Sequence, residues 1–202
     1  MAPLYLCPSL TGYLFQLKFK TKMQDLPLSI IVIPGIAVLV DILLFTILLQ
    51  KTNQKKIYYR YVFAIIIIAF LLNAAWEILQ IPLYKGGAYQ WDHILFCVLA
   101  SVADVIMVLL IYLGFAFIYK NALWIKNFSA SRIIILILTG GIGAVVAETR
   151  HLSIGTWSYA DTMPLIPFFK VGLSPVLQFM VLPFFIYLLS FKMVTRYYHI
   201  TK

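Results

Sequence analysis

Acidic side chains lie within long apolar segments of this 202-residue chain. Glu77 follows a run of isoleucine, alanine and leucine residues, Asp104 falls inside a later apolar run, and Glu148 ends another. A charged side chain at the centre of a bilayer costs at least about 2.5–3.5 kcal/mol on insertion scales, so these carboxyls should face protein rather than lipid. Two carboxyls in one site of low dielectric constant can share a proton, which suits one to act as general acid and the other as base. We therefore predict catalytic roles for Glu77 and Glu148, with Asp104 orienting them.

Glu77 belongs to a polar stripe on a predicted helix. Asn73, Trp76, Glu77 and Gln80 recur at three- and four-residue spacing, which puts them on one helical face. In an apolar membrane helix such a face looks inward, toward other helices. Two interpretations stay open: hydrogen bonds that hold helices together, for which Asn73 and Gln80 are suited, and a surface that binds a substrate.

The stretch from Glu148 to Gln178 combines many polar and aromatic residues with several prolines. Its candidate binding residues are Arg150, His151, Trp157, Tyr159 and Gln178. The aromatic rings could stabilise a developing cation through their π-faces, whereas Arg150 and His151 suit an anionic headgroup or simply pair with Glu148. Long, proline-pinned connections in small domains are often lids or binding loops, so we expect a lid whose two ends supply side chains to the site.

The composition indicates which elements position these residues. The chain is 63% hydrophobic and 11% charged, with a mean hydropathy of +0.96, which is typical of an integral membrane protein. The apolar runs are continuous rather than alternating, which excludes a β-barrel and predicts an all-α polytopic membrane bundle of about five helices in a single transmembrane domain. The predicted spans, each long enough to cross a hydrocarbon core of about 30 Å, are 27–49, 58–82, 93–119, 132–149 and 173–192.

Basic residues predict the orientation of these spans in the cell membrane. With five spans, ten of the 16 Lys and Arg residues fall on the side of the C-terminus and six on the other side. The positive-inside rule then predicts a cytoplasmic C-terminus and an N-terminus outside, although Lys18, Lys20 and Lys22 oppose this orientation. Residues 1–26 begin with an apolar patch that is too short and too broken by proline and glycine to span, and we interpret the segment as interfacial.

Other sequence features exclude several classes of function. The formal charge of +9 is spread over connectors and tails, so it predicts helix orientation and not nucleic-acid binding. The three histidines lie on separate connectors and the two cysteines are isolated, so no metal site, disulfide framework or cofactor is predicted. Small residues around Gly140 predict close approach of a neighbouring helix.

The residues described above resemble a pattern found in a group of small bacterial integral membrane proteins. The resemblance covers about a quarter of the chain and implies that its residues act as a set, but it implies no particular activity. The pattern consists of Asn73, Trp76, Glu77, Gln80, Pro82, Tyr84, Glu148, Trp157, Tyr159, Met163, Pro164, Gly172, Leu173, Ser174, Pro175 and Gln178.

A shorter segment is similar to part of the carotenoid hydratases and lycopene-cyclase-type membrane proteins. The similarity consists of Glu148 followed by Gly155, Trp157 and Tyr159. It implies acid chemistry on a polyisoprenoid. The cyclases place an acidic pair after the proline, whereas Pro167 is followed here by two phenylalanines, which argues against cyclisation.

These observations lead to two hypotheses. The first is a polar and aromatic pocket, open toward the outer leaflet, that binds a lipid or isoprenoid and performs acid–base chemistry such as hydration, isomerisation or cyclisation. The second is a non-enzymatic transporter or membrane interaction protein. Asp41, which lies well inside the first span, discriminates between them. A proton or ion path would continue from the outer polar cluster to Asp41, whereas an enzyme pocket would end before reaching it.

Overall fold

The computed structural model describes the main chain of residues 29–200 and contains five long α-helices in that range. They are α2 (Ser29–Lys51), α3 (Lys55–Gln80), α4 (Trp91–Ile118), α5 (Ala130–Ser153) and α6 (Leu173–Ile200). Two short 3₁₀ helices, η1 (Ile81–Leu83) and η2 (Trp124–Asn127), lie in the connections. The described residues form no β-strand, so the predicted all-α class is confirmed.

All five helices are long and apolar enough to cross a membrane, which confirms a multi-pass membrane protein. Each helix overlaps one of the predicted spans, and α5 and α6 run further than expected at their C-terminal ends. The predicted interfacial segment 1–26 lies outside the described residues. The expected orientation of the termini and the single-domain organisation stay predictions.

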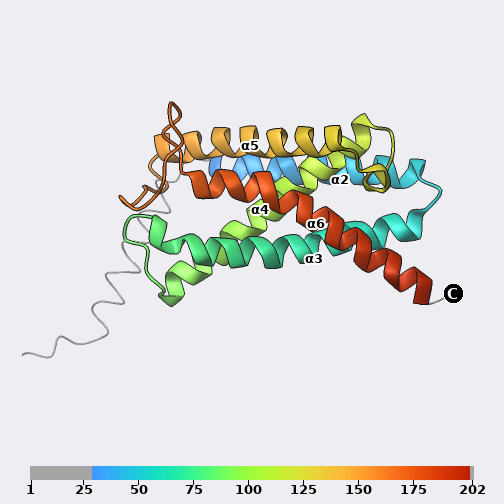
Figure 1. Cartoon of the computed structure of the whole chain (residues 1–202), viewed down its shortest axis with the longest axis horizontal. Coiled ribbons are helices and arrows are strands. Elements are labelled where there is room, and N and C mark those ends of the chain that lie inside the picture. Colours follow the sequence, from blue (N-terminus) through green and yellow to red (C-terminus); the bar gives the residue numbers. More distant parts are fainter. Residues whose placement is uncertain (1–28, 201–202) are drawn as a thin grey trace, which may run out of the picture. The chain divides into compact units, whose positions relative to one another are not determined.

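The chain divides into two compact units, Met1–Ile36 and Ala37–Lys202. Of the first unit, the structure describes the opening turns of α2, which contain Pro34 and Gly35. In the second unit, α3 packs against both α4 and α6, and α5 packs against α6 (Figure 1). This arrangement brings the C-terminal ends of α3 and α5 to the same end of the unit as the N-terminal ends of α4 and α6. We call it the loop end, because the connections 81–90 and 154–172 lie there.

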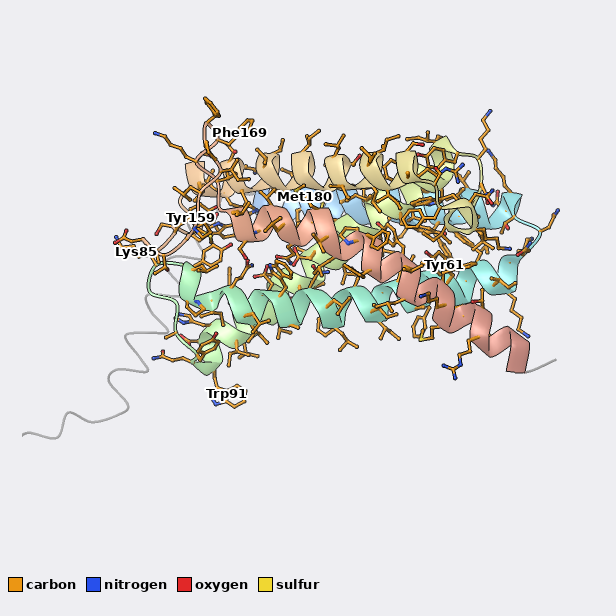
Figure 2. All side chains as sticks on the ribbon, in the orientation of Figure 1. Tyr61, Lys85, Trp91, Tyr159, Phe169 and Met180 are labelled. Atoms are coloured by element: carbon orange, nitrogen blue, oxygen red, sulfur yellow. The ribbon has the colours of Figure 1, made fainter. Side chains whose placement is uncertain are left out.

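At the opposite end of this unit, aromatic side chains of η2, α4 and α6 pack into a buried core. Trp124 of η2 is fully buried and contacts Tyr112 and Tyr187, and its indole N–H donates to the carbonyl oxygen of Tyr112 at 3.3 Å. The hydroxyl of Tyr112 donates to the carbonyl oxygen of Ala122. Tyr61 of α3 lies in the same half of the unit, edge-on to Tyr112 (Figure 2). The connection between α4 and α5 is therefore tied into the helix core.

Helices α5 and α6 approach so closely at Gly140 that no side chain fits there. A Cβ atom added to Gly140 would lie 1.9 Å from the carbonyl oxygen of Phe179, a backbone atom of α6. The next residue, Gly141, would contact only the flexible side chain of Met180, at 3.1 Å. Met180 is labelled in Figure 2. The small-residue face predicted from the sequence is thus the surface that allows this contact.

We expect Gly140→Ala to lower the stability of the protein by about 1–3 kcal/mol, because the helices must separate to admit the methyl group. Alanine favours a helix over glycine by about 0.8–1.0 kcal/mol, and the expected loss exceeds this gain. Thermal unfolding of the purified protein measures the effect. Gly143→Ala is the matched control, since a Cβ there meets nothing within 4 Å and should leave Tm unchanged or slightly raised. Equal Tm values for the two variants would contradict the close approach.

Candidate functional site

Glu148, near the end of α5, is a buried carboxylate with two side-chain hydrogen-bond donors. The hydroxyl of Tyr159 donates to its Oε2 atom, and the indole N–H of Trp157 donates to the same atom at 3.3 Å. Both donors come from the connection 154–172 that follows α5. The connection that we expected to be a lid therefore folds back onto α5. Its side chains donate hydrogen bonds to the carboxylate of Glu148 near the end of that helix.

The same connection is joined by its backbone to the end of α3. The N–H of Lys85 donates to the carbonyl oxygen of Ser158 at 2.8 Å, and the N–H of Ala160 donates to that of Leu83 at 2.9 Å. These two bonds flank an isolated antiparallel bridge between Tyr84 and Tyr159. We call this pairing the seam. Figure 2 shows Lys85 and Tyr159 together at the loop end.

The amide of Gln178 on α6 connects three helices below the seam. The side chain is 1% exposed, and its Nε2 atom donates to Asn73 Oδ1 of α3 at 2.9 Å and to Asp104 Oδ2 of α4 at 3.1 Å. The Nδ2 atom of Asn73 in turn donates to the carbonyl oxygen of Ala69 in its own helix. Asn73, Asp104 and Gln178 were predicted from three separate segments, and the fold brings them together.

Gln80 links this network to Glu77. Its Nε2 atom donates to Glu77 Oε1 at 2.7 Å and lies 3.5 Å from Gln178 Oε1. Its Oε1 atom accepts a hydrogen bond from the hydroxyl of Ser174 at 2.9 Å. The side-chain amide of Gln80 is therefore both a donor and an acceptor. It holds the carboxyl of Glu77 and at the same time joins α3 to Ser174 of α6.

Tyr84 lies where the two groups of residues meet. Its ring contacts Trp157 edge-on, with centroids 6.2 Å apart, and tilts against Tyr159 at 5.6 Å. Burial and then the nearby charges of Glu148, Glu77 and Asp104 raise the pKa of Tyr84 well above its usual range. The three predicted carboxyls come from three helices and are linked at the loop end through Gln80, Gln178 and Tyr159. We call these three acids with Tyr84 the carboxyl cluster.

The phenol of Tyr159 is also held in its neutral form. Burial, followed by its hydrogen bond to Glu148, raises the pKa of Tyr159 above the ordinary tyrosine range. A phenol that keeps its proton remains a donor to the carboxylate. Tyr159 is therefore a neutral donor to Glu148 at the loop end.

Three other predicted residues lie at the edge of this arrangement. No ion pair joins Arg150 to Glu148, whose carboxylate is bonded by Trp157 and Tyr159 instead. His151 stacks on Trp157 with centroids 4.2 Å apart, and its Nδ1 atom lies 3.3 Å from Thr156 Oγ1. Trp76 packs against the hydrophobic core, and its buried indole N–H has no hydrogen-bond partner.

Two residues of this site were not among the predicted site residues. Tyr84 and Ser174 were noted only as members of the motif resembling the bacterial membrane proteins. Tyr84 follows the helical stripe after Pro82, so helical periodicity does not place it near the acids. Its relation to Glu148 depends on the seam, which pairs segments far apart in the sequence.

A layer of apolar side chains separates the carboxyl cluster from Asp41. On α3, Val62 and Ile66 lie beside Asp41, and Ile66 is seven residues, or about 10 Å, from Asn73. Buried apolar residues occupy the intervening turns of three helices; they are Ile65, Ala69, Val105, Val108, Leu182 and Ile186. Within the described part of the chain, neither oxygen of Asp41 has a hydrogen-bond partner. No hydrogen bond therefore leads from the cluster to Asp41 through the described residues.

Comparisons with models of protein families, with curated proteins and with solved structures find no match to this chain. Within the described part of the chain, no three His, Cys, Asp or Glu side chains are grouped so that they could hold a metal ion. The fold and the side chains at the loop end define a polytopic α-helical membrane protein with a buried group of carboxyls.

Proposed function

We propose that the carboxyl cluster binds an apolar lipid or isoprenoid and transfers protons to and from it. The observation that carries this proposal is the hydrogen-bond network at the loop end, in which Gln80 and Gln178 join Glu77 to Asp104. Glu148 is bonded by Tyr159, whose ring packs against Tyr84. Adhesion between helices requires hydrogen bonds, which neutral amides supply at lower cost than three buried acids. Three acids around one point suit a reaction in which a proton is given and taken.

In this proposal Glu148 accepts a proton and Glu77 donates one, while Asp104 and Gln178 fix the position of Glu77 through Gln80 and its neighbours. Trp157 and Tyr159, which lie beside Glu148, form the aromatic part of the site. Protonation of an alkene creates a carbocation, which aromatic π-faces stabilise. Hydration or isomerisation of a double bond is the chemistry that fits these groups; the two phenylalanines after Pro167 argue against cyclisation.

The alternative is a non-enzymatic transporter or membrane interaction protein. An ion path would need polar groups between the cluster and Asp41, and the intervening turns of α3, α4 and α6 carry buried apolar side chains. This layer supports the proposal of a site that ends within the loop half of the bundle.

Native mass spectrometry of the protein purified in lipid nanodiscs tests whether the cluster binds such a ligand. We expect a retained isoprenoid or lipid, with lower occupancy in both Glu77→Gln and Glu148→Gln, because the bound molecule is proposed to lie against these two side chains. The control is Asp161→Asn, an exposed acid in the same connection as Trp157 and Tyr159. Unchanged occupancy in both glutamine variants would leave these acids a structural role only.

A further inference from the structure

Asp41 is a buried acid that the proposed function does not use. Its side chain is 7% exposed, and neither carboxylate oxygen has a hydrogen-bond partner among the residues that the structure describes. It lies in the part of α2 that belongs to the unit Ala37–Lys202. An ionised carboxyl at this depth costs at least about 2.5–3.5 kcal/mol, so the acid either keeps its proton or pairs with a cation when it ionises.

Asp41 lines a groove of about 240 Å³ between α2, α3 and α4. The other residues that line the groove are mostly apolar or aromatic; they include Phe45 on α2 itself and Val62, Phe63, Ile66, Leu109 and Leu113 on α3 and α4. Phe63 and Ile66 are exposed on the surface of a helix that crosses the membrane, so the groove faces the region where lipid lies. A ligand would enter it from the bilayer.

We propose that this groove binds a lipophilic amine, whose ammonium group pairs with the carboxylate of Asp41. A lipid chain alone would match the apolar lining of the groove but would not neutralise the charge of an ionised Asp41. A cationic group on an apolar chain matches both the lining and the charge. The aromatic rings of Phe45 and Tyr59, which also line the groove, favour a cation through their π-faces. A charge-assisted hydrogen bond from the ammonium to the carboxylate supplies the specificity.

The size of the groove sets the part of the ligand that it holds. Sites that enclose a drug-sized molecule have about 300–1,000 Å³, so 240 Å³ accommodates an ammonium group and the first part of one chain. The rest of the chain stays in the bilayer. Both oxygens of Asp41 are buried in this structure, so pairing with the ammonium requires rotation about the two side-chain torsions of Asp41 toward the groove.

This site is independent of the carboxyl cluster. The apolar layer described above separates the two, and Asp41 shares no hydrogen bond with any residue of the cluster. Loss of the amine site is therefore expected to leave binding at Glu77 and Glu148 unchanged, and the two proposals can fail separately.

The test uses dodecylamine as the probe and dodecanol as its uncharged counterpart, with the full-length protein in phosphatidylcholine nanodiscs. We expect saturable binding of the amine, at least about tenfold tighter than that of the alcohol, which corresponds to about 1.4 kcal/mol. Asp41→Asn, which keeps the shape of the side chain, should abolish this preference. Asp92→Asn, which removes the same charge from an exposed position, should retain it.

A second variant keeps the acid and fills the groove. Ile66→Trp should weaken binding of both probes, because the larger side chain occupies the space along the wall. Equal binding of amine and alcohol by the unmodified protein would overturn the proposal, as would a preference for the amine that survives Asp41→Asn. If Ile66→Trp bound the amine normally, the groove would not be the site.

Discussion

Replacing Glu148 by glutamine is expected to slow proton transfer to a bound alkene by about 100-fold or more, because a positioned general acid or base typically contributes 10²–10⁴-fold. Glutamine keeps the size of the side chain and can still accept hydrogen bonds from Trp157 and Tyr159, but it cannot take up a proton. Glu77→Gln should have an effect of similar size. Asp104→Asn should have a smaller one, because Asp104 is proposed to orient the other acids.

Deuterium uptake measures this step without knowledge of the final product. The protein is incubated in D₂O with the linear polyene squalene as probe, and the recovered hydrocarbon and its products are analysed by mass spectrometry. Hydration and isomerisation both begin with transfer of a solvent-derived proton, so both introduce deuterium. Asp161→Asn should match the unmodified protein. Equal uptake in Glu148→Gln and the unmodified protein would refute a catalytic role for Glu148.

The second large effect is expected at Gln178. Gln178→Leu removes the bonds to Asn73 and Asp104 and the contact with Gln80, and it leaves polar groups of α3 and α4 buried without partners. Hydrogen bonds between membrane helices average about 0.6 kcal/mol, whereas an unsatisfied buried group costs about 1–3 kcal/mol. Since the substitution leaves more than one such group, we expect a loss of about 2–4 kcal/mol in the free energy of unfolding.

Thermal and chemical unfolding in the same nanodiscs check this expectation. Gln90→Leu is the matched control, because the side chain of Gln90 is exposed before the first turn of α4. Its Tm should stay close to that of the unmodified protein. If Gln178→Leu and Gln90→Leu unfolded alike, the amide network would contribute nothing to holding the helices together.

The helices and the inward face of α3 could be predicted because hydrophobicity and helical periodicity are local properties. Spacings of three and four residues placed Asn73, Glu77 and Gln80 together, and α3 is one continuous helix through all of them. The buried amide of Gln178 was also predicted as part of a shared site. What periodicity could not supply was its partner, because a helical pattern indicates which face is buried and not which helix covers it.

The loop end was less predictable, since its geometry depends on contacts between distant segments. Arg150 is nearer to Glu148 in sequence than Tyr159, yet Tyr159 reaches the acid because the connection 154–172 folds back over the end of α5. The turn within this connection has positive φ angles at Phe168 (71°) and Lys170 (54°), a conformation that neither residue type favours. Such a turn has no local sequence signal of the kind that glycine provides.

The seam between Leu83–Lys85 and Ser158–Ala160 has a consequence for the free energy of ligand binding. Its two backbone hydrogen bonds fix the end of α3, which carries Glu77, to the segment that holds Glu148. The spacing of the two acids is therefore set when the chain folds, before any ligand arrives. In the proposed reaction, acids that are already held in place need little rearrangement. Binding energy can then stabilise the transition state instead of moving the acids into position.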